Sequence, residues 1–122
     1  MKQIKIRASI TSKETKRIDK VEATYEEKKY IYYIEKDKEK TVTIYNLQND
    51  TLERDNEEMY LYLPFKTKEE TLGTMIVKDI NQEIKLEIYT KEILKNKKEI
   101  KIRYTLNDEQ YTYRLEYGEE NT

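Results

Sequence analysis

Arg54 stands out chemically because acidic residues flank it on both sides. Side chains alternate along an extended strand, so Arg54 shares a face with Leu52, and Glu35 shares one with Tyr33. If both faces point inward, Arg54 and Glu35 form a buried ion pair with Tyr33 and Thr43 as hydrogen-bond partners. Such a pair in an apolar cavity is a polar anchor for a ligand. Two alternatives stay open: both side chains are solvated, or the pair only fixes the strand register.

The residue types that most enzymes use are missing from this chain. It has no His and no Cys among its 122 residues, which excludes Ser-His and Cys-His nucleophile pairs, the usual zinc sites, haem and iron–sulfur ligation, and disulfides. Any catalysis would depend on carboxylates, Lys or Tyr alone. We therefore expect a protein that is not an enzyme and that holds no cofactor and no metal.

Five acidic residues lie close together in the sequence: Asp50, Glu53, Asp55, Glu57 and Glu58. A calcium loop needs such acids to converge around a turn with a glycine, and this segment has no glycine. We interpret it as a solvated hairpin. The 25 acids of the chain also make a glycosidase pair unassignable, because sequence spacing does not give the distance between carboxylates.

The charge is balanced overall, with a net charge of −1 that gives no general attraction to nucleic acid or anionic membranes. It is uneven along the chain: residues 1–20 carry +5, residues 85–103 carry +4 and residues 46–70 carry −4. If the two basic stretches are neighbours, one side of the molecule is positive, and Tyr89 and Tyr104 are near it to stack on bases. Outward lysines also protect strands from aggregation. We favour that simpler explanation, and nucleic-acid binding is disfavoured.

The elements that position these residues are strands. Charged residues make up 40% of the chain, but they alternate with apolar ones, and Tyr, Ile and Thr are abundant, unlike in disordered chains. Nine or ten short strands separated by turns every 8–12 residues predict an all-β fold, a mostly up-and-down antiparallel β-barrel of about 8–10 strands. A change of parity after Ile18 predicts a β-bulge near Asp19 and Lys20, and Gly73 predicts a close backbone approach. Most of the 12 tyrosines are expected at the core and rim.

We expect a single barrel domain over residues 1–117 and an acidic, frayed tail over residues 118–122. The outward faces are expected to be mostly Lys and Glu, which differs from a membrane barrel. No transmembrane helix and no signal peptide are predicted, because no long apolar run occurs. The absence of Cys fits a reducing compartment. Together these features predict a cytoplasmic protein.

Eight short segments, taken in order, carry a family resemblance: residues 30–35, 41–44, 52–54, 59–65, 71–74, 86–90, 100–106 and 114–116. This set resembles the YwiB-like family of small bacterial proteins of unknown function, which have calycin-type barrels. The chain departs from the family pattern at Asn56, where a Gly is usual, and at residues 79–82, where the family often has a turn with Pro and Gly. Asn also adopts left-handed turn conformations. The resemblance implies a barrel related in shape to lipocalins and fatty-acid-binding proteins, which hold apolar ligands inside.

The sequence therefore predicts a non-enzymatic binder of a small apolar or amphipathic molecule inside the barrel. Arg54 and Glu35 are the expected polar anchors, with Tyr33, Thr43 and Tyr104 as lining. The alternative is an interaction module whose charged outer face binds protein or, less favoured, RNA. Neither the ligand's identity nor the oligomeric state follows from the sequence.

Overall fold

The computed structural model describes residues 1–118, and every regular element in that range is a β-strand. The strands are β1 (Lys2–Ser12), β2 (Lys16–Glu26), β3 (Tyr30–Ile34), β4 (Val42–Asn46), β5 (Thr51–Asp55), β6 (Met59–Pro64), β7 (Glu70–Val77), β8 (Gln82–Lys95), β9 (Glu99–Leu106) and β10 (Glu109–Glu116). The expected tail lies outside the described residues, apart from Gly118. No helix in the described range is long and apolar enough to cross a membrane.

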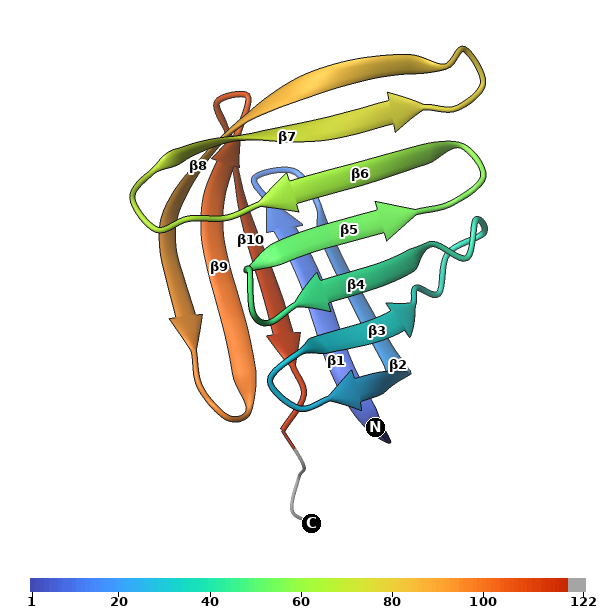
Figure 1. The fold of residues 1–122 in the computed structure, drawn as a ribbon, viewed down its shortest axis with the longest axis vertical. Helices are drawn as coiled ribbons and strands as arrows, with labels where there is room; N and C mark the ends of the chain where they lie inside the picture. The colour runs from blue at the N-terminus through green and yellow to red at the C-terminus, as the bar shows by residue number, and fades with distance from the viewer. Residues whose placement is uncertain (119–122) are drawn as a thin grey trace.

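Each strand pairs antiparallel with its neighbours in the sequence, and β10 pairs with β1 to close the barrel. This arrangement confirms the predicted up-and-down barrel, and the ten strands lie at the upper end of the predicted number. Strands β3–β7 run across β1, β2 and β10, so the barrel is flattened into two crossing layers (Figure 1). The two basic stretches of the sequence are not direct neighbours, because β10 lies between β9 and β1.

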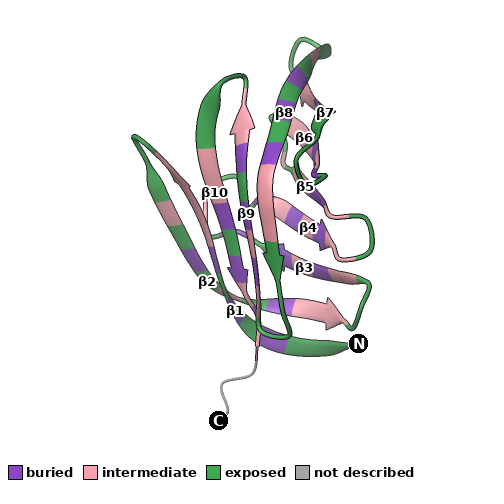
Figure 2. Ribbon diagram, turned by 90° about the vertical axis from the view of Figure 1, so that its left-hand side faces the viewer, coloured by how far each residue is buried: buried purple, intermediate pink, exposed green. Residues whose placement is uncertain are grey.

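The core follows from strand alternation, which turns every second side chain inward. The buried bands along β9, β10 and β1 recur in this way (Figure 2). Tyr45, Tyr113, Ile31, Ile102 and Leu115 are each fully buried and fill the interior. Tyrosines thus supply much of the core volume, as expected, although their hydroxyls must then find polar partners inside it.

The predicted β-bulge near Asp19 and Lys20 is wrong. β1 and β2 pair without interruption from Lys2–Tyr25 to Thr11–Lys16. Arg17 and Asp19 therefore point inward, while Ile18 points outward and is 39% exposed. The apparent change of parity arose because two charged residues occupy inward positions. The register shift that does occur lies in β8, between Thr90 and Glu92.

Gly73 on β7 confirms the expected close backbone approach. A Cβ atom added there would lie 2.6 Å from the Tyr62 carbonyl oxygen and 2.9 Å from the Ile88 Cδ1 atom. The carbonyl belongs to the neighbouring strand and cannot move without disturbing the sheet. We expect Gly73→Ala to lower the free energy of unfolding by about 1–3 kcal/mol.

Urea denaturation measures this effect. The neighbouring Thr74→Ala serves as the control, because the Thr74 side chain lies on the outer face and its loss is expected to change stability by only about 0.5 kcal/mol. Equal stabilities of the two variants would show that the site accommodates a side chain.

Candidate ligand site in the barrel

Glu35 and Arg54 form an ion pair inside the barrel. The Arg54 Nε atom donates to Glu35 Oε2 at 2.8 Å, and the Arg54 Nη2 atom donates to Glu35 Oε1 at 2.7 Å. The Glu35 side chain is 2% exposed, and that of Arg54 is 16% exposed. Burial lowers the pKa of Arg54, but the hydrogen bonds and charge of Glu35 outweigh that effect and raise it overall. The guanidinium is therefore held charged in a fixed orientation.

The sheet register explains why these two side chains meet. Tyr33 on β3 pairs with Thr43 on β4, and Thr43 pairs with Arg54 on β5. Glu35 directly follows β3 on the same inward face, so Arg54 reaches it past Thr43. The Thr43 hydroxyl donates to Glu35 Oε2 at 2.6 Å, as predicted. Both oxygens of Glu35 are thereby satisfied by protein donors.

Tyr33 does not bond to the ion pair, contrary to the prediction. Its hydroxyl lies 2.8 Å from that of Tyr113 on β10, on the opposite side of the barrel. Burial raises the pKa of both tyrosines well above the ordinary value, so both hydroxyls stay protonated. This contact ties the two layers of the barrel together beside the ion pair.

Arg17 and Asp19 extend the polar cluster, and sequence reasoning missed them. The Arg17 Nε atom lies 3.1 Å from Asp19 Oδ2, and its Nη2 atom lies 3.4 Å from Glu35 Oε1. Asp19 also accepts the Lys36 backbone N–H at 3.2 Å, and the Arg17 Nη1 atom lies 3.8 Å from Asp37. These contacts join β2 to the segment after β3, where the β2–β3 ladder has already ended at Ala23. The sequence signal for this cluster is an Arg and an Asp at alternate positions of one strand, which puts both side chains on the same face.

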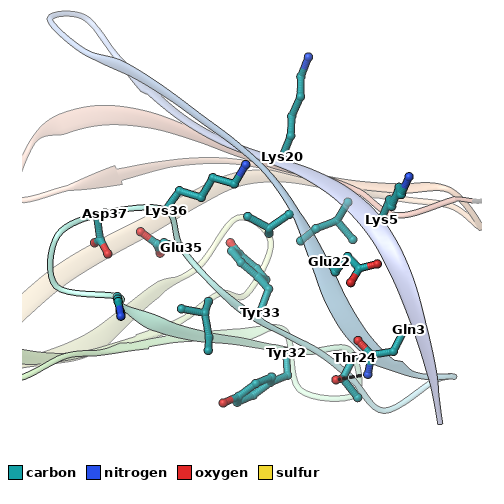
Figure 3. A pocket seen from close by; sticks show the side chains of 14 residues that line it. Gln3, Lys5, Lys20, Glu22, Thr24, Tyr32, Tyr33, Glu35, Lys36 and Asp37 are labelled. Atoms are coloured by element: carbon teal, nitrogen blue, oxygen red, sulfur yellow. Dashed lines mark hydrogen bonds between the residues drawn. The ribbon is translucent and has the colours of Figure 1, made fainter.

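A hollow of about 830 Å³ opens at the seam between β2 and β3 (Figure 3). Tyr33 and Glu35 form part of its wall, together with the apolar Ile6 and Val21. Lysines stand around it, among them Lys36, whose side chain extends beside Glu35 (Figure 3). The seam is thus a place where a molecule from solvent meets the polar cluster.

The five predicted site residues are only partly brought together. Tyr33 and Glu35 line the seam hollow, while Arg54 and Thr43 lie behind Glu35 and do not line it. Tyr104 packs against Phe65 and Tyr111, with ring centroids 4.9 and 5.6 Å away. Burial raises the pKa of Tyr104, and the positive charge of Arg54 opposes that rise. Tyr104 therefore interacts with Arg54 only through its charge.

The fold and the site together define a closed, ten-stranded antiparallel barrel with a charged, hydrogen-bonded interior. No protein-family model and no curated protein sequence matches the chain. Among solved structures, it is similar to the crystal structure of the ywiB protein from Bacillus subtilis. That similarity has a TM-score of 0.42 and 17% sequence identity, over 95% of this chain and 90% of the other.

Proposed function

We propose that this chain is a non-enzymatic, calycin-like barrel of the bacterial cytoplasm that binds a small, partly apolar molecule. The observation that carries the proposal is the buried guanidinium of Arg54, held in place by Glu35 next to the seam hollow. Burying a charge is costly, and an ion pair offsets that cost only in part. A ligand that uses the charge gives the pair a role beyond stability.

The chemistry of the guanidinium defines the polar end of the ligand. Glu35 occupies the edge formed by Nε and Nη2, which leaves the Nη1 edge for an acceptor; the acceptor must reach past Glu35, because Arg54 itself does not line the seam hollow. Its orientation is fixed before binding, which lowers the entropic cost of forming the complex. A carboxylate, sulfonate or carbonyl group on the ligand fits this edge.

The surroundings define the apolar part of the ligand. Ile6, Val21 and the ring of Tyr33 supply apolar wall at the seam, and Lys20 and Lys36 flank it. An apolar body against this wall would place its polar end toward the Glu35–Arg54 pair. The ligand class is therefore a small amphipathic molecule with an acceptor group at one end.

The test uses 1-anilinonaphthalene-8-sulfonate, an apolar fluorophore with a sulfonate, as the probe. We expect the protein to enhance its fluorescence at one site and the double variant Glu35→Leu/Arg54→Leu to weaken binding by about tenfold or more, the effect of losing one charged hydrogen bond. The matched control is Glu99→Leu/Arg114→Leu, which removes an exposed pair of the same residue types. Equal binding by the two folded double variants would contradict the anchor role.

The alternative function is an interaction module that uses its charged outer face. It is favoured by the basic side chains that β9, β10 and β1 turn outward, including Lys101, Arg103 and Arg7. Their arginines are already paired with acids: Arg7 with Glu116 and Arg103 with Glu92. If the protein passes through a column of immobilised single-stranded RNA at low salt without being retained, RNA binding by the outer face is excluded.

A further inference from the structure

The outer surface of β3–β7 differs from the Lys- and Glu-rich surface that the sequence analysis predicted. These five strands contain no lysine, and their only arginine, Arg54, points inward. Their outward apolar and tyrosine side chains form what we call the tyrosine face: Tyr30, Tyr32, Ile34, Val42, Ile44, Tyr60, Tyr62, Leu72 and Ile76. The polar residues Asn46, Glu53, Asp55, Glu70 and Thr74 share this side of the sheet. In a chain with 40% charged residues, such a surface requires an explanation.

The register places most of these side chains in two rows across the sheet, each interrupted by one acid on β5. In one row Tyr32 pairs with Ile44, and Glu53 separates Ile44 from Tyr62. The next row runs parallel from Ile34 on β3 to Ile76 on β7. The strands lie side by side (Figure 1), so the two rows are adjacent, and Glu53 and Asp55 on β5 interrupt them.

The tyrosine face carries little uncompensated charge. Its central acids are Glu53 and Asp55 on β5. Glu53 accepts the Tyr60 hydroxyl at 2.7 Å, and Asp55 accepts Lys78 Nζ at 2.6 Å. The neutral Tyr60 hydroxyl leaves the charge of Glu53 uncompensated, whereas Lys78 compensates that of Asp55, so the face is mainly apolar and tyrosine with one uncompensated carboxylate near its centre.

The shape of the tyrosine face is also self-complementary. A hollow of about 410 Å³ lies at its β3 border, lined by Tyr30, Tyr32 and Ile44 with Thr24 and Asn46. Leu72, 63% exposed, projects at the opposite border on β7. In a dimer with two-fold symmetry, the same surface of each copy must carry both halves of every contact. Here the hollow and the projecting Leu72 lie on one face.

The size of the face fits a dimer interface. Five strands about 4.8 Å apart and three rows of outward residues cover roughly 20 by 20 Å, or about 400 Å² in projection. Apolar patches of roughly 300–600 Å² are often functional. At about half of the roughly 800 Å² per partner of a standard interface, the face fits a weak, concentration-dependent dimer.

We propose that the tyrosine face is the docking surface for a second copy of this chain, forming a symmetric dimer. The inference is independent of the proposed ligand site, because the tyrosine face lies outside the barrel and the ion pair inside it. Two copies bring the uncompensated carboxylates of Glu53 toward one another. Salt therefore strengthens this association, whereas it weakens a complex held by opposite charges.

Sedimentation equilibrium over a wide dilution series tests the proposal. We expect the wild-type chain to dimerise, and Ile44→Lys, in the middle of the face, to weaken dimerisation by roughly 30-fold or more, as for a central interface residue. The matched control is Ile18→Lys, which places the same charge at an exposed isoleucine on β2 and should leave the dimer unchanged. Both variants alter outward side chains, and circular dichroism is the check that they fold.

A wild-type chain that stays monomeric at millimolar concentration would overturn the proposal. Equal weakening by Ile44→Lys and Ile18→Lys would overturn it as well, because it would place the interface elsewhere.

Since the chain has no Cys, the double variant Thr24→Cys/Leu72→Cys gives a third test. Oxidation should link two copies covalently where the hollow of one meets the projection of the other, and a dimer that does not cross-link would exclude the two-fold arrangement.

Discussion

Replacing Arg54 with Met is expected to lower the free energy of unfolding by about 3–5 kcal/mol, measured by urea denaturation at neutral pH. The Glu35 carboxyl group would then have the Thr43 hydroxyl and a 3.4 Å contact to Arg17 as its remaining donors inside the barrel. The loss arises because this buried group loses its two short hydrogen bonds from Arg54 and keeps only the more distant contact to a cation. Methionine has nearly the apolar volume of the arginine stem, so cavity formation contributes little.

Two controls separate this cause from general disruption. The double variant Glu35→Leu/Arg54→Leu removes both charges and should recover stability to within about 1–2 kcal/mol of the wild type. Arg114→Met breaks an exposed pair with Glu99 and should cost less than about 1 kcal/mol. If Arg54→Met were no more costly than Arg114→Met, the Glu35–Arg54 pair would be solvated rather than buried.

The fold was predictable because alternation marks most strands clearly. Ile100, Ile102 and Tyr104 on β9 point inward as their spacing indicates, and all three are buried. The same rule put Glu35 in phase with Tyr33 and Arg54 in phase with Leu52, and the structure shows that both of these faces point inward. For β9 the period of two alone decided the outcome, whereas for Glu35 and Arg54 it fixed only which neighbours share their face.

The parts that were not predictable depend on contacts between distant strands. The hydroxyls of Tyr33 and Tyr113 meet across 80 residues of sequence, which no local pattern encodes. Arg17 and Asp19 point inward because the β1–β2 register places them there, although a parity analysis assigns inward positions to apolar residues. The Tyr33–Tyr113 contact depends on how the barrel closes, and the inward Arg17 and Asp19 depend on the register of the β1–β2 hairpin.

The tyrosine face was missed for a related reason. In the segments around Tyr32 and Ile44, both faces of the strand carry Tyr, Ile, Val or Thr, so hydrophobicity does not alternate. Without alternation, the pattern does not indicate which face of the strand points into the barrel. Only the pairing of Tyr33 with Thr43 shows that Tyr32 and Ile44 share the outer surface.

Alkaline pH is expected to unfold this protein over a narrow range. Burial is the main cause that raises the pKa of Tyr33, Tyr45, Tyr104 and Tyr113 above the ordinary tyrosine value. In the unfolded chain these hydroxyls lose their protons near pH 10, whereas in the folded chain they keep them. Their contribution to stability is therefore complete below about pH 10 and is lost as the pH rises toward the folded values.

The expected loss is large because four buried hydroxyls act together. Each contributes about 1.4 kcal/mol per pH unit above pH 10, so the four remove roughly 5 kcal/mol per unit, against a typical total stability of about 5–15 kcal/mol. Urea denaturation at several pH values, with the ultraviolet absorbance of tyrosinate followed in parallel, measures both effects. Tyr113→Phe should reduce the slope of stability against pH by at most about one quarter, because the raised pKa values of Tyr60, Tyr111 and Tyr117 also contribute to that slope. The exposed Tyr89→Phe should leave the slope unchanged, because Tyr89 is 38% exposed. Ionisation of all tyrosines near pH 10 in a protein that stays folded would show that these hydroxyls are not buried.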